Sequence, residues 1–140
     1  MKKDTILAIL IFVVCSVNGC RSKSKNTDNQ ANKMTKLEFE QRIADFGKVP
    51  TDTLLVAEYN FVNAGNHALE IEYINPDCTC TDYKLSSRQV APKEQGTIQL
   101  VFNTKDRIGQ QEIFAIVKAN TEDRFYRLLL KADVEYPEAE

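Results

Sequence analysis

The sequence has little of what most catalytic sites are built from. Its 140 residues include one histidine, His67, and no serine in a nucleophile-elbow context, so a Ser-His-Asp hydrolase is not indicated. The spacings typical of zinc proteases, P-loops and dinucleotide-binding loops are also missing. We therefore expect a protein that is not an enzyme, with no identified small-molecule substrate, and a solvent-exposed His67 beside a hairpin turn.

The chain also has little excess of either positive or negative charge. Lysine and arginine total 18 against 20 aspartates and glutamates, and the formal net charge is -2. A mildly acidic chain without a dense basic stripe lacks the electrostatic footprint of a phosphate-backbone binder. The composition therefore argues against a nucleic-acid partner.

No apolar run is long enough to span a bilayer. The longest, Ile6 to Val14, has about nine residues, which is the length of a signal-peptide core. It follows Lys2-Lys3 and is succeeded by a small glycine directly before Cys20. This combination predicts a bacterial lipoprotein signal peptide at 1–19, with Cys20 as the lipidated, palmitate-bearing first residue of the mature chain.

Two alternatives remain for this segment, an ordinary cleaved signal and an uncleaved anchor in which Cys20 is incidental. In the lipoprotein interpretation, Cys15 is discarded with the signal. Residues 20–36 then form a flexible tether with a reach of roughly 20 to 24 Å. The lipid on Cys20 would hold the protein to the membrane of the cell envelope. The absence of acidic residues in 21–25 favours a position facing the periplasm.

From Leu37 onward the pattern changes to short segments in which apolar and polar residues alternate. Strands are predicted near 43–47, 55–61, 69–73, 98–102, 113–119 and 125–134. In the third of these, Leu69, Ile71 and Tyr73 are expected on one face. The second is followed by Asn63-Ala64-Gly65-Asn66, a turn sequence suited to positive φ.

Six or seven short strands without a convincing helical stretch predict one all-β domain at 37–136, followed by a tail at 137–140. The gaps between strands are mostly too short for crossover helices, which excludes a parallel α/β fold. We therefore predict an antiparallel, immunoglobulin-like β-sandwich.

The segment that could carry chemistry is Asp77-Cys78-Thr79-Cys80-Thr81-Asp82. In an extended backbone, Cys78 and Cys80 point to the same side, so their sulfurs can act together. Three interpretations stay open: a disulfide, a two-thiolate metal site, and two small side chains that only pack. Asp77 and Asp82 are expected to be turn-forming residues.

Each interpretation of Cys78 and Cys80 has a physical limit. Closing so small a loop contributes only about 1.6 kcal/mol, and the backbone would have to bend to bring the sulfurs together. Two soft thiolates suit Cu(I), whereas structural zinc would need four ligands. His67 is an unlikely third ligand because a strand of roughly 26 Å separates it from Cys78.

Several motifs between about Ile43 and Val134 resemble the domain of unknown function 1573 family, immunoglobulin-like lipoproteins common in Bacteroidota. They are Asn63-Ala64-Gly65, Cys78-Thr79-Cys80-Thr81, Pro92-x-Glu94-x-Gly96, Phe102-Asn103-Thr104 and Leu128-Leu129-Leu130-Lys131-Ala132. The family usually has Cys-Gly-Cys-Thr and Pro-Gly-Glu, whereas this chain has Thr79 and Lys93 at the two glycine positions. The resemblance implies the fold and location predicted above, maps the family's cysteine pair onto Cys78 and Cys80, and implies no activity.

Together these features predict a membrane-tethered, non-enzymatic interaction module of the envelope. Its expected surfaces for a protein partner are the loop from Pro76 to Tyr83 and a free sheet edge. The alternative is an envelope thiol protein that binds Cu(I) or exchanges disulfides through Cys78 and Cys80.

Overall fold

The computed structural model describes residues 33–137, which fold into nine β-strands. The strands are β1 (Leu37–Phe39), β2 (Ile43–Pro50), β3 (Leu54–Asn63), β4 (Leu69–Pro76), β5 (Thr81–Leu85), β6 (Gln89–Val90), β7 (Gln95–Asn103), β8 (Gly109–Ala119) and β9 (Phe125–Glu135). Within residues 33–137, no helix is long and apolar enough to cross a membrane.

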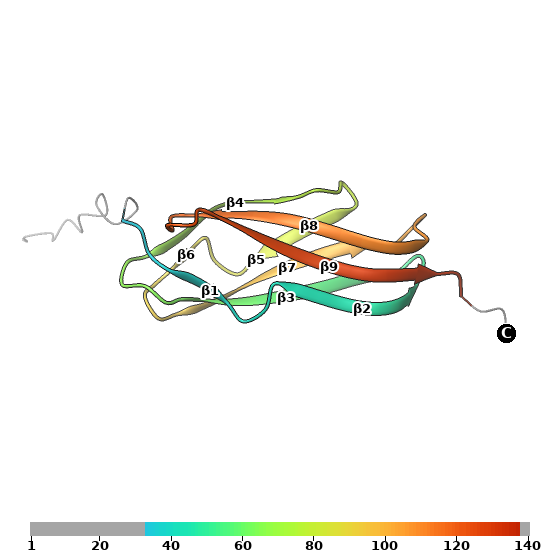
Figure 1. Ribbon diagram of the computed structural model, residues 1–140, viewed down its shortest axis with the longest axis horizontal. Helices are drawn as coiled ribbons and strands as arrows, with labels where there is room; N and C mark the ends of the chain where they lie inside the picture. The colour runs from blue at the N-terminus through green and yellow to red at the C-terminus, as the bar shows by residue number, and fades with distance from the viewer. Residues whose placement is uncertain (1–32, 138–140) are drawn as a thin grey trace, which may run out of the picture.

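The strands form two sheets that pack face to face (Figure 1). One sheet has the order β1-β3-β7-β5 and the other the order β2-β9-β8-β4-β6. The predicted all-β sandwich is therefore confirmed. Among the named strands, β2 and β9 form a parallel pair and the other neighbours are antiparallel. The parallel pair arises because the chain crosses between the sheets after β1, and β2 then joins the edge beside β9.

The core lies between the sheets and follows the alternation seen in the sequence. Leu55, Ala57, Tyr59 and Phe61 of β3 are buried, while the residues between them point outward. Gly96 of β7 leaves room for the ring of Phe61, because an added Cβ would lie 2.4 Å from the Cζ atom of that ring. Burial of every second side chain on both sheets supplies the driving force for the fold.

The prediction that Tyr73 lies on the same face of its strand as Leu69 and Ile71 is wrong. Leu69 and Ile71 are buried as expected, but the register of β4 against β8 shifts between Ile71 and Tyr73. Beyond this irregularity the alternation is displaced by one residue, so Tyr73 is 42% exposed and Ile74 is buried instead.

The prediction of positive φ in the turn after β3 is also wrong, because none of its residues has that conformation. Gly65 meets a different requirement, since a Cβ there would lie 2.1 Å from Oγ1 of Thr35. The buried Asn63 side chain donates to the carbonyl oxygens of His67 and Val90, and its Oδ1 accepts from the Thr35 hydroxyl. Hydrogen bonding to the domain thus begins inside the segment predicted as tether, at Lys33, whose carbonyl oxygen accepts from the side chain of Asn120 at 3.0 Å.

Tyr59 connects the two sheets directly. Its hydroxyl donates to the carbonyl oxygen of Leu129 in β9 at 2.9 Å. Burial raises the pKa of Tyr59 to about 12. The neutral phenol is therefore the form that the folded state favours.

We expect Tyr59→Phe to lower the free energy of unfolding by about 1 kcal/mol near neutral pH, because the hydrogen bond is lost. The preference of the folded state for the neutral phenol is fully present below the unfolded pKa of about 10. It is lost as the pH rises through about 12, where the folded tyrosine also ionises. Denaturant titrations at pH values from about 10 to about 12 should therefore show that the variant loses less stability with rising pH than the wild type does. Equal losses in both proteins would exclude Tyr59 as the responsible group.

Candidate functional site

The cysteine segment forms a tight turn that carries the chain from β4 in one sheet to β5 in the other. The N–H of Thr81 donates to the carbonyl oxygen of Cys78 at 3.1 Å and closes the turn. The Cα atoms of Cys78 and Cys80 lie 5.1 Å apart, and their sulfurs form a disulfide. The extended backbone considered for this pair is therefore replaced by the bend that a disulfide requires.

Both ends of the turn are held by neighbouring strands. The N–H of Asp77 donates to the carbonyl oxygen of Phe114 at 2.9 Å, and Oδ1 of Asp77 accepts from the N–H of Phe114 at 3.0 Å. The N–H of Asn103 donates to the carbonyl oxygen of Cys80 at 3.1 Å. Asp77 thus has the predicted role in the turn. The same prediction is wrong for Asp82, which lies within β5 and is exposed.

The predicted loop from Pro76 to Tyr83 is shorter in the structure. Pro76 is the last residue of β4, and the segment from Thr81 to Tyr83 belongs to β5, so the connection itself spans only 77–80. The alternation of Thr81, Tyr83 and Leu85 is the signal that could have revealed this strand.

The two sulfurs have different surroundings. Sγ of Cys78 lies 3.1 Å from the backbone N of Cys80 and 3.7 Å from Nη2 of Arg107, and both nitrogens donate to it. Sγ of Cys80 lies 3.8 Å from the hydroxyl of Thr81. Both cysteines are half-buried and pack against the core. Arg107 was not found from the sequence, because it lies 29 residues from Cys78 in the loop between β7 and β8.

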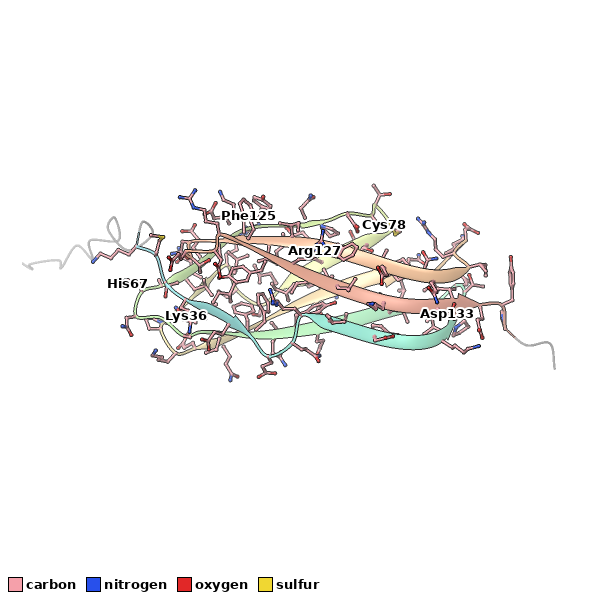
Figure 2. The ribbon with its side chains drawn as sticks, in the orientation of Figure 1. Lys36, His67, Cys78, Phe125, Arg127 and Asp133 are labelled. Carbon is pink, nitrogen blue, oxygen red and sulfur yellow. A yellow bond between two sulfur atoms is a disulfide. The ribbon has the colours of Figure 1, made fainter. Side chains whose placement is uncertain are left out.

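The other possible ligand lies far from this turn. Figure 2 shows His67 and Cys78 towards opposite ends of the sandwich. His67 is half-buried, so it is less exposed to solvent than predicted. Within residues 33–137, no group of three or more His, Cys, Asp or Glu side chains could hold a metal ion. A Cu(I) site at Cys78 and Cys80 would first require reduction of their disulfide to two thiolates.

The two positions at which the chain departs from the family's glycines differ in backbone conformation. Lys93 keeps a left-handed backbone with φ of 69°, and its N–H donates to the carbonyl oxygen of Asn63 at 2.8 Å. Thr79 does not have positive φ. The glycine-like conformation thus survives in the Pro92-Lys93-Glu94 turn and is absent from the disulfide turn. Cys20 and the signal peptide lie outside the described residues.

Solved structures share the fold at low sequence identity. A protein of unknown function from Porphyromonas gingivalis W83 matches with a TM-score of 0.64 and 12% identity, over 74% of this chain and 48% of that one. The PapD-like domain 7 of human CEP192 matches with a TM-score of 0.56 and 12% identity, over 75% and 89% of the two chains. The YadV chaperone gives a TM-score of 0.51 and 12% identity, over 74% and 54%. The chain thus spans about half the length of the Porphyromonas protein.

No curated protein matches the chain. The family model described as "Protein of unknown function (DUF1573)" matches residues 37–134, which include the disulfide turn, the core and the greater part of both sheets. Because this match covers well over half of the sequence, the chain belongs to the DUF1573 family.

Proposed function

We propose that this protein is a non-enzymatic binding module of the bacterial envelope, held to the membrane by a lipid on Cys20. In this proposal, the module receives an extended segment of a partner protein along the free edge of β5. The observation that carries the proposal is that β5 pairs with β7 on one side and, within residues 33–137, with no strand on the other.

The backbone of β5 offers hydrogen-bonding groups to an added strand. β5 pairs with β7 in unbroken register, and the N–H of Ser86 and the carbonyl oxygen of Cys80 both bond towards β7. Because backbone groups along a strand alternate in direction, Tyr83 and Leu85 direct their N–H and C=O groups away from β7. An incoming segment could use these groups to extend the sheet.

The remaining edge strands are less suited to pairing. β2 is interrupted by a bulge between Asp45 and Lys48, has φ of 62° at Gly47, and ends at Pro50. Bulges, lysines and prolines protect an edge against a further strand. β1 has three residues and β6 has two. Among the four outermost strands of the two sheets in the described part of the chain, β5 is therefore the most regular.

The proposed tether agrees with the arrangement of the domain. The described chain begins at one end of the sandwich and finishes at the other (Figure 1). A lipid on Cys20 would hold the first end near the membrane and let the body project from it. Because residues 21–25 carry no acidic side chain, we place the module on the periplasmic side.

The anchor is tested by Cys20→Ser in the full-length chain. We expect the variant to lose lipid labelling and to leave the membrane fraction, while the matched variant Cys15→Ser keeps both, because only Cys20 receives acyl chains. Palmitate labelling and fractionation, with and without globomycin, measure this. Unchanged labelling and membrane association of Cys20→Ser would contradict the anchor.

The edge is tested by photo-cross-linking in intact cells, with benzoylphenylalanine in place of Tyr83 or, as a matched aromatic control, Tyr136. We expect a discrete protein adduct from the first position alone.

Tyr83→Ala and Tyr83→Pro both remove the ring, but only proline removes the outward N–H. When benzoylphenylalanine replaces Leu85 instead, the yield of the cross-linked adduct should therefore be about tenfold lower in Tyr83→Pro than in Tyr83→Ala. This is the loss expected for one missing hydrogen bond. Equal adducts in the two variants would exclude strand addition at this edge.

The double variant Cys78→Ser, Cys80→Ser separates the binding module from the thiol alternative. We expect it to fold and to lose about 1.6 kcal/mol of stability, because the loop that the disulfide closes is small. Its cross-link at β5 should persist. Denaturant titration, cross-linking and copper analysis of the reduced wild type are the measurements. Stoichiometric copper in the reduced wild type, absent from the variant, together with a lost cross-link, would favour the thiol function instead.

A further inference from the structure

The disulfide turn is chemically asymmetric. The sulfur of Cys78 faces the guanidinium of Arg107 at 3.7 Å and the N–H of Cys80 at 3.1 Å, whereas the sulfur of Cys80 has the neutral hydroxyl of Thr81 at 3.8 Å. Such donors interact weakly with a sulfur in a disulfide and strongly with a thiolate. The surroundings of Cys78 are therefore suited to a negative charge that the oxidised protein does not carry.

We infer that Cys78–Cys80 is an exchangeable disulfide, in which Cys78 is the leaving sulfur and Arg107 stabilises its thiolate. The co-reactant is a dithiol, either a small molecule or a protein with two neighbouring cysteines. This inference is independent of the binding proposed for β5, since it depends on the turn and on the loop between β7 and β8.

The exchange proceeds in two balanced steps. A thiolate of the dithiol attacks Sγ of Cys80, a new S–S bond forms, and the Cys78–Cys80 bond breaks with its electron pair on Cys78. The second thiol of the dithiol then loses its proton and attacks the dithiol sulfur that is bonded to Cys80. This step forms a disulfide within the co-reactant and releases Cys80 as a thiolate. The dithiol is oxidised by two electrons, the cysteine pair is reduced by two, and solvent supplies the protons that the products bind.

Position and loop size both favour exchange. Cys78 and Cys80 are half-buried, and Thr79 between them is exposed, so a thiol can approach the turn from solvent. Opening the bond releases a constraint of only about 1.6 kcal/mol, so the fold survives reduction. The backbone hydrogen bonds of the turn to Phe114 and Asn103 do not involve the sulfurs.

Arg107 is held in place independently of the sulfurs. Its N–H donates to the carbonyl oxygen of Thr104 at 3.0 Å, and the hydroxyl of buried Thr104 accepts from the N–H of Thr53 at 2.8 Å. These bonds fix the backbone of Arg107 without involving the disulfide and place its guanidinium within reach of Cys78. Arg107 acts as a positioning residue for the leaving sulfur.

The experiment uses the full-length protein in detergent, treated with glutathione, trapped with an alkylating reagent and mapped by peptide mass spectrometry. We expect glutathione on Cys80 and the alkyl group on Cys78. In the reduced protein, the pH at which the alkylation rate of Cys78 reaches half its maximum should lie below that of an ordinary cysteine, because Arg107 faces its sulfur. Arg107→Gln should move this midpoint up by about one unit and lower the preference for Cys80 adducts about threefold.

Lys105→Gln is the matched control, because it removes one positive charge from the same loop and leaves Arg107 in place. It should keep the wild-type midpoint, and Arg107→Lys should fall between wild type and Arg107→Gln. Glutathione mainly on Cys78 in the wild type, or a midpoint unmoved by Arg107→Gln, would overturn the inference. The wild-type adduct decides the question even if an Arg107 variant does not fold.

Discussion

One shared layer of apolar side chains between the two sheets determines the rest of the structure. Alternate residues of β3, β7, β8 and β9 fill it, and Tyr59, Phe61 and Phe102 are among the largest side chains fully enclosed. A slip of one residue in any of these strands would turn its apolar set towards solvent. Because the side chains of this layer are enclosed between the sheets, the sheet edges and the turns are the parts available for recognition and chemistry.

Much of the fold could be predicted from the sequence, because a strand with one buried face has a period of two residues. The alternation around Tyr59 located β3 and its buried face correctly. The same rule gave the wrong face for Tyr73, since the irregularity in β4 depends on how that strand pairs with β8. The residues 63–66 favour a positive-φ turn by their type, whereas the structure constrains the glycine among them, Gly65, by close contact with Thr35. Both differences arise from tertiary contacts that no local pattern contains.

The candidate site was only half accessible to sequence reasoning. The spacing of Cys78 and Cys80 indicated that the two sulfurs could act together, but it left a disulfide, a metal site and simple packing open. Arg107 carried no signal, because its proximity to Cys78 follows from the way the loop between β7 and β8 meets the turn between β4 and β5. The difference between the two sulfurs is therefore a property of the assembled sandwich.

The parallel pairing of β2 and β9 has a mechanical consequence. The described chain enters at one end of the sandwich and leaves at the other, and these two strands lie side by side with the same direction (Figure 1). Traction applied between the ends loads the hydrogen bonds of this pair in shear, all at once. A hairpin opened from its free ends breaks its bonds one after another under a smaller force. Stretching along the long axis therefore meets a shear clamp formed by the first long strand and the last.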